Sequence, residues 1–193
     1  LINNWEATYF EFTEEKILQL AQVASRAGIE LFVLDDGWFG KRNNDESSLG
    51  DWKVNLDKLP NGLNDLAERI NELGMKFGLW FEPEMISIDS DLYREHPDWA
   101  IHIEGRLPIY SREQLVLDLT KQEVCDYIID SVSSILESGN ITYVKWDMNR
   151  NITNIPEGLA NDQCFEFHHR YMLGLYRVLD HLTKRFPDIL FES

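Results

Sequence analysis

The stretch "TYVKWDMNR", residues 142–150, reads as a short buried strand that ends in charged residues. Side chains alternate along a strand, so Val144 and Trp146 share one face, which suits packing against a layer of helices. Lys145 and Asp147 share the opposite face and would point into a pocket at the end of the strand. Because a neighbouring cation lowers the pKa of a carboxyl group, we expect Lys145 to keep Asp147 ionised. An ionised, oriented carboxylate is what a covalent nucleophile needs.

Strands of this kind alternate with helices along the chain. The first helix is expected to begin after Thr13 as its N-cap and to end at Gly28. The third is expected to begin with a capping box of Thr120 and Glu123. Helices joined by short turns to following strands produce right-handed crossovers and a parallel sheet, so the fold class is α/β, either open or closed. The expected strands are 7–12, 30–34, 76–81, 142–146 and 189–191, and the last helix is expected over 162–185.

Acidic residues end four successive predicted strands. In a parallel sheet the carboxyl ends of the strands lie at one edge, where the long loops 35–62, 82–119 and 147–161 also lie. The alternative for any one of these acids is a turn former or N-cap. Trp80 shares a face with Glu82, and an indole beside carboxylates suits a pyranose; its alternative is a core filler. The strand-end acids are Asp35, Asp36, Glu82, Glu84, Asp147 and Glu192.

Composition limits the class of ligand and the compartment. The sequence holds 34 acidic and 18 basic residues, and its net charge of −16 repels nucleic acid and anionic membranes. No apolar run approaches the roughly 18 residues that a membrane span requires, and no charged-then-apolar leader opens the chain. Cys125 and Cys164 lack partners at metal-ligand spacing and are interpreted as packing residues in a reducing compartment, which favours the cytoplasm. The start at Leu1 indicates an internal piece of a longer protein.

Five strings occur in the order "NNWEATYFEF", "LFVLDDGWFG", "FGLWFEPEM", "SREQLVLDLT" and "YVKWDMNR". In this order the chain resembles the catalytic barrel of bacterial α-galactosidases of glycoside hydrolase family 36. The resemblance implies a (β/α)8 TIM barrel, of which this chain holds the first four β/α units and the fifth strand. It also implies that residues 1–193 are a partial catalytic domain of a longer multidomain enzyme, which we expect to be a homo-oligomer.

The same resemblance implies a reaction and a set of site residues. Family members remove terminal α-galactosyl residues from oligosaccharides such as melibiose and raffinose, with retention, through a covalent galactosyl-enzyme. Asp147 matches the nucleophile, and Asp35 and Asp36 match residues that bind galactose hydroxyls. The general acid/base follows the strand that ends "FES" and is absent from this chain, so we expect the isolated chain to be inactive. No metal or cofactor is implied, and the further substrate contacts are Trp80, Arg112, Lys145 and Asn149.

Two other functions fit part of the pattern. Acids at successive strand ends can hold Mg²⁺ in an enolase-like barrel, and Asp36, Glu82 and Asp147 would be the ligands. Trp80 in the pocket and a lysine beside Asp147 argue against this, since a cation competes with the metal. A half-barrel without its general acid could also serve only as a galactose-binding or assembly module.

Overall fold

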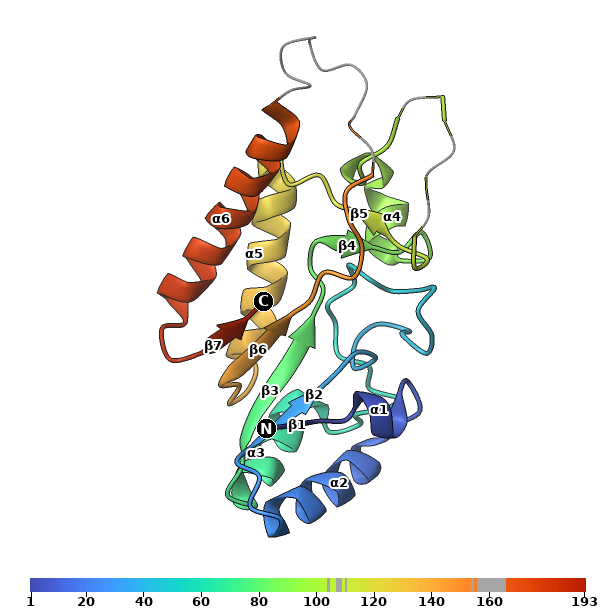
Figure 1. The fold of residues 1–193 in the computed structure, drawn as a ribbon. Helices are drawn as coiled ribbons and strands as arrows, with labels where there is room; N and C mark the ends of the chain where they lie inside the picture. The colour runs from blue at the N-terminus through green and yellow to red at the C-terminus, as the bar shows by residue number, and fades with distance from the viewer. Residues whose placement is uncertain (104, 107–108, 110, 154, 156–165) are drawn as a thin grey trace.

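The protein is built around a five-stranded parallel sheet (Figure 1). A computed structural model describes residues 1–103, 105–106, 109, 111–153, 155 and 166–193. Strand order in the sheet follows the order along the chain, so each new strand adds at the same edge. The strands are β1 (Ile2–Asn3), β2 (Leu31–Leu34), β3 (Lys76–Phe81), β6 (Tyr143–Trp146) and β7 (Leu190–Glu192).

One long helix follows each of the first four strands. The sheet and helices therefore form four successive β/α units and a fifth strand, as predicted for a partial (β/α)8 barrel. The last two long helices pack side by side (Figure 1). Gly174 allows the last helix to approach the Leu119 carbonyl so closely that any larger side chain would collide with it. The helices are α2 (Glu14–Arg26), α3 (Gly62–Glu72), α5 (Gln122–Glu137) and α6 (Phe167–Arg185).

Helix α2, the first long helix, begins and ends where the sequence predicts. Thr13 is the N-cap, and its side chain accepts a hydrogen bond from the Lys16 amide. Gly28, just beyond the helix, has a φ of +79°, a left-handed conformation that glycine adopts without strain. Among the described residues no helix is long and apolar enough to cross a membrane. Cys125 is a buried free thiol, whereas Cys164 and the predicted helix start at residue 162 lie outside the described residues.

The strand predicted over residues 7–12 is wrong. The first strand is β1, and the short helix α1 (Trp5–Thr8) follows it at once. The Asn3 side chain accepts a hydrogen bond from the Trp5 amide, and the Asn4 carbonyl accepts bonds from the amides of residues 7 and 8. These local bonds turn the chain before its apolar run. The residues whose pattern predicted a strand therefore lie in α1 and the loop that follows it.

The predicted capping box at α5 is also wrong. The N-cap is Lys121, and no side chain caps the helix. The Thr120 hydroxyl donates to the Asp118 carboxylate instead, and so does the Thr120 amide. Asp118 thus closes a turn of its own before the helix, which leaves the threonine hydroxyl engaged outside the helical turn.

The loop after β3 carries a small second layer of structure. It contains a two-stranded antiparallel sheet and lies beyond the carboxyl end of β3 (Figure 1). Pairing between its strands brings residues 85–86 beside residues 115–116, so the two ends of this long loop are held together. Its elements are β4 (Met85–Ile86), α4 (Asp91–Glu95), the 3₁₀ helix η1 (Pro97–Trp99) and β5 (Leu115–Val116).

Candidate active site

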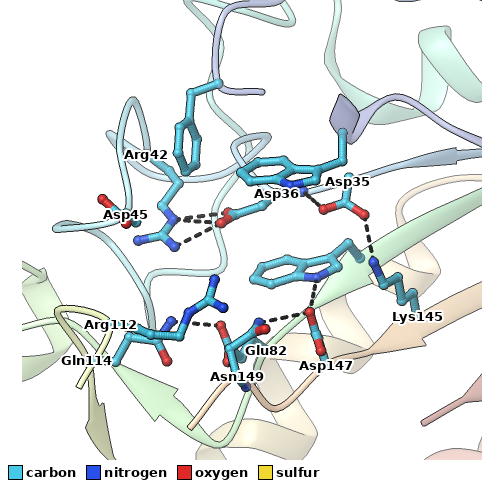
Figure 2. A pocket seen from close by; sticks show the side chains of 13 residues that line it. Asp35, Asp36, Arg42, Asp45, Glu82, Arg112, Gln114, Lys145, Asp147 and Asn149 are labelled. Atoms are coloured by element: carbon cyan, nitrogen blue, oxygen red, sulfur yellow. Dashed lines mark hydrogen bonds and ion pairs between the residues drawn. The ribbon is translucent and has the colours of Figure 1, made fainter. Parts of the chain in front are cut away.

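The strand register gathers the predicted residues at one end of the sheet. Trp80 pairs with Lys145 across β3 and β6, and Leu34 lies level with Leu79, so Asp35 is level with both. A cavity of about 290 Å³ opens there (Figure 2). Every residue predicted for the site lines this cavity: Asp35, Asp36, Trp80, Arg112, Lys145, Asp147 and Asn149. The further lining residues are Trp5, Phe10, Arg42, Asp45, Glu82 and Gln114.

Neutral donors orient the carboxylate of Asp147. Its Oδ2 accepts hydrogen bonds from Trp80 Nε1 at 3.0 Å and from Asn149 Nδ2 at 2.8 Å. Its Oδ1 accepts from the Met148 amide at 3.0 Å. The side chain is half-buried at the cavity wall, so one carboxylate is held in a fixed direction yet faces the space that a ligand would fill.

Lys145 forms an ion pair with Asp35, so the prediction that it pairs with Asp147 is wrong. Its Nζ lies 3.0 Å from Asp35 Oδ2 (Figure 2). Asn3 Nδ2 donates to the same oxygen, and the Asp35 amide donates to the Asn4 side chain. The register explains the difference, since Lys145 is level with Asp35 while Asp147 lies two residues further along the strand. A long lysine side chain can cross β3 to reach it.

Asp36 faces a buried arginine that the sequence patterns did not single out. The Arg42 Nη2 and Nε atoms both donate to its carboxylate, with the shortest contact at 2.8 Å (Figure 2). Arg42 also donates to the Ser47 carbonyl and is 1% exposed. Burial raises the pKa of Asp36, and the Arg42 bonds oppose that rise. No local sequence motif marks Arg42, because it meets Asp36 only after the loop between them has folded back onto the end of the strand.

A buried lysine braces the loop between Asp36 and Arg42. Lys58 Nζ donates to the carbonyls of Gly37 and Arg42, at 2.9 and 2.7 Å, and so ties the two ends of the loop. Burial lowers the pKa of Lys58 to about 8. Its ammonium also lies 4.8 Å from the centre of the Phe12 ring, a cation–π contact. Arg42 therefore holds the Asp36 carboxylate directly, and Lys58 holds the backbone of the loop that carries both.

Glu82 lines the cavity and has a raised pKa, but both of its carboxylate oxygens are already bonded. Burial raises its pKa to about 7, the bonds from Asn149 oppose the rise, and the charges of Asp147 and Asp36 add to it. The side chain is fully buried. Its Oε1 accepts from the Asn149 amide at 2.5 Å, and its Oε2 accepts from Gln114 Nε2 at 3.1 Å. Both oxygens are engaged, so Glu82 is placed to hold other residues in position.

Neither of the other strand-end glutamates belongs to the cavity. Glu84 is buried on the helix side, where it accepts hydrogen bonds from Trp146 Nε1 at 3.0 Å and from the Tyr171 hydroxyl at 2.6 Å. Glu192 ends β7 and is exposed. The acid pattern in the sequence therefore combines site carboxylates with one structural anchor, which joins α6 to the sheet.

Aromatic side chains form the wall of the cavity behind Trp80. The Phe39 ring lies parallel to the Trp80 indole with centroids 6.2 Å apart, and Trp38 Nε1 donates to the Trp80 carbonyl at 2.9 Å. Trp5 and Phe10, from the loop after β1, line the cavity as well. Trp80 itself lines the cavity, on the strand face that alternation predicts.

Arg112 reaches the cavity from a tight turn. The turn joins Ser111 to Gln114, and its two central residues, Arg112 and Glu113, have φ angles of 55° and 56°. Two successive positive φ angles define a type I′ turn, which usually takes Asn or Gly. The non-glycine residues adopt this backbone at an energetic cost. The structure thus uses a strained turn to bring a guanidinium to the cavity.

The cavity suits an uncharged polyhydroxy ligand. Five acidic and three basic side chains line it beside the indole and phenyl rings, so it offers many acceptors and an apolar wall. Within the described part of the chain, no group of three or more His, Cys, Asp or Glu side chains is arranged to hold a metal. The pairing of Asp35 with Lys145 and of Asp36 with Arg42 also argues against the magnesium alternative.

Comparison with known proteins gives matches over the full length of the chain. The melibiase family matches residues 1–193. α-Galactosidase AgaA of Geobacillus stearothermophilus is 61% identical over 194 residues, covering 100% of this chain and 27% of that protein. α-Galactosidase Mel36A of Lactobacillus acidophilus is 55% identical and is covered over 26% of its length. The chain thus spans about a quarter of the length of these relatives.

Solved structures agree with the sequence matches. The crystal structure of the family 36 α-galactosidase AgaB from Geobacillus stearothermophilus superposes with a TM-score of 0.95 at 61% identity, covering 99% of this chain and 27% of that one. A variant of AgaA from the same organism, crystallised in complex with raffinose, gives a TM-score of 0.95 at 60% identity with the same coverage.

Proposed function

The chain belongs to the melibiase family, glycoside hydrolase family 36, and on this basis we propose that it is part of the catalytic barrel of a longer enzyme that removes terminal α-galactosyl residues from oligosaccharides such as melibiose and raffinose. The observation that carries the proposal is the orientation of Asp147 by Trp80 and Asn149 at the wall of an acid-rich, aromatic cavity. The raffinose bound to a variant of AgaA supports this class of substrate.

Asp147 is the nucleophile of the proposed reaction. A carboxylate oxygen attacks the anomeric carbon as the bond from that carbon to the leaving oxygen breaks. The leaving oxygen takes a proton from a general acid, which we place outside this chain. A water molecule then attacks the galactosyl ester, gives its proton to the same group, and frees Asp147. Two inversions at the anomeric carbon yield galactose with retained configuration.

The other cavity residues recognise the sugar. Asp35 and Asp36 accept hydrogen bonds from galactose hydroxyls, and their ion pairs with Lys145 and Arg42 keep them oriented. The Trp80 indole covers the apolar C–H face of the ring. Arg112 and Asn149 add polar contacts from the loops, as the family resemblance predicts. The reaction needs no metal or cofactor in this scheme.

The test is the stereochemistry of the first product. Proton NMR of the full-length protein with a nitrophenyl α-galactoside should show the α-anomer of galactose first, followed by slow conversion to the β-anomer. Initial β-anomer would overturn retention. Binding of galactose without any turnover would favour the galactose-binding module instead. Cytoplasmic location and homo-oligomeric assembly stay predictions, which cell fractionation and sedimentation of the full-length protein would check.

A further inference from the structure

Two residues at the end of β3, Trp80 and Glu82, help to hold Asp147 in place, Trp80 directly and Glu82 through Asn149. Trp80 donates to Asp147 Oδ2 directly. Glu82, two residues later, accepts a hydrogen bond from the backbone amide of Asn149, and the Asn149 side chain donates to Asp147 Oδ2. Asn149 is thus fixed at its backbone by Glu82 and presents its side chain to Asp147. The proposed reaction assigns no chemical step to Glu82.

The second bond of Glu82 reaches the loop that carries Arg112. Gln114 Nε2 donates to Glu82 Oε2, and Gln114 closes the tight turn that carries Arg112. Arg150, next to Asn149, donates to the Gln114 carbonyl at 2.5 Å. One buried carboxyl therefore joins the segment of the nucleophile to the turn of the substrate-contacting arginine.

Stability alone gives little reason for a carboxyl group at this position. Among the described residues, Glu82 bonds to amides, and none of these partners is a cation that would offset the cost of burying an ionised carboxylate. An apolar side chain of the same length would avoid that cost, but it would leave the Asn149 amide without an acceptor.

We propose that Glu82 is a positioning residue that orients the nucleophile Asp147 through Asn149. The inference rests on the proposed function, since it assumes that Asp147 is the nucleophile. A shift of about 1 Å at a reacting group can cost about 100-fold in rate. Loss of the Glu82 acceptor should therefore slow attack by Asp147 much more than it weakens binding of the sugar.

The experiment measures attack and binding separately in the full-length protein. An activated fluorinated galactoside reports the rate of covalent labelling of Asp147, and calorimetry with galactose reports Kd. Glu82→Gln keeps an acceptor for the Asn149 amide and should label within about tenfold of the wild-type rate. Glu82→Met removes the acceptor and should label about 100-fold more slowly. Both variants should change the galactose Kd by less than about threefold.

A double-mutant cycle tests whether Glu82 acts through Asn149. Asn149→Ala keeps the backbone amide but removes the side chain that contacts Asp147. If Glu82 acts through that side chain, Glu82→Met should slow the Asn149→Ala variant by less than about threefold. Independent, multiplicative losses would overturn the proposal, and so would wild-type labelling by folded Glu82→Met. If Glu82→Met does not fold, Asn149→Ala decides: labelling at the wild-type rate would overturn the proposal, because Glu82 could not then act through the Asn149 side chain.

Glu84→Gln is the matched control, because Glu84 is a second buried carboxyl on the same segment that does not line the cavity. It should lower the melting temperature through its bonds to Trp146 and Tyr171 while the labelling rate stays at the wild-type value. A wild-type protein that is not labelled and does not hydrolyse α-galactosides would refute the proposed function. An active wild type whose Glu82 variants label normally would refute only the positioning role.

Discussion

Replacing Glu82 by glutamine should change how the stability of the protein depends on pH. Burial raises the pKa of Glu82 from 4.5 to about 7, so the folded protein holds a proton that the unfolded chain releases between these values. Stability contributed by this group is therefore present at low pH and is lost as pH rises from about 4.5 to about 7. At about 1.36 kcal/mol for each pH unit, the total is about 3 kcal/mol.

About 2.5 kcal/mol of this loss falls between pH 5 and pH 8. Glu82→Gln does not titrate, so the free energy of unfolding of its catalytic domain should rise relative to wild type by about 2.5 kcal/mol between these pH values. Differential scanning calorimetry of the full-length proteins measures this. Glu82→Met should show the same relative gain from a lower starting stability. A difference between wild type and Glu82→Gln that stays constant from pH 5 to pH 8 would refute the assignment of a buried, titrating carboxyl.

The remaining predictions concern the nucleophile, the two cation-paired aspartates and the isolated chain. Asp147→Asn should abolish covalent labelling while leaving galactose binding within about tenfold, as mass spectrometry and calorimetry would show; labelling at another carboxylate would refute the assignment. Arg42→Met should cost about 3 to 5 kcal/mol of unfolding free energy, because it strands a buried carboxylate, whereas an unchanged denaturation midpoint would contradict the buried pair. Asp36→Ala should cost about 2 to 4 kcal/mol in kcat/KM for a galactoside, and no change in a folded variant would remove Asp36 from the site. The isolated 193-residue chain should self-associate in sedimentation, since Leu173, Tyr176 and Leu190 are exposed on α6 and β7. It should also fail to hydrolyse a nitrophenyl α-galactoside, because we place the general acid outside this chain; an active monomer would contradict both expectations.

The features that were predicted correctly depend on local chemistry. Thr13 caps a helix within three residues, and Gly28 ends it through its own φ angle, so neighbouring residues decide both. Strand alternation placed Trp80 and Asp147 on the cavity face, because side chains alternate between the two faces of a strand whichever strands lie beside it. The α/β class followed from the order of elements alone.

The features that were missed depend on long-range pairing or on competing local bonds. Lys145 meets Asp35 because the register of three strands brings them level, and alternation along one strand carries no such information. Gln114 lies 32 residues from Glu82, so the bond between them exists only after the long loop has folded. The turn after β1 shows the other kind of failure, since Asn3 and Asn4 bond the backbone before an apolar run that resembles a strand.

Four of the six strand-end carboxyls line the cavity, and their partners distinguish their roles where the sequence treats them alike. Asp35 and Asp36 each form an ion pair with a cation, which fixes the carboxylate in place as an acceptor but partly neutralises its negative charge. Asp147 accepts hydrogen bonds from neutral donors and forms no ion pair with any described residue, so its oxygens are oriented without a cation, which suits the proposed nucleophile. Glu82 is fully buried, and both of its oxygens already accept hydrogen bonds from amide groups. Within the described residues, Asp147 combines oriented oxygens, partial exposure at the cavity wall and no ion pair, and this supports the proposal that it attacks the sugar.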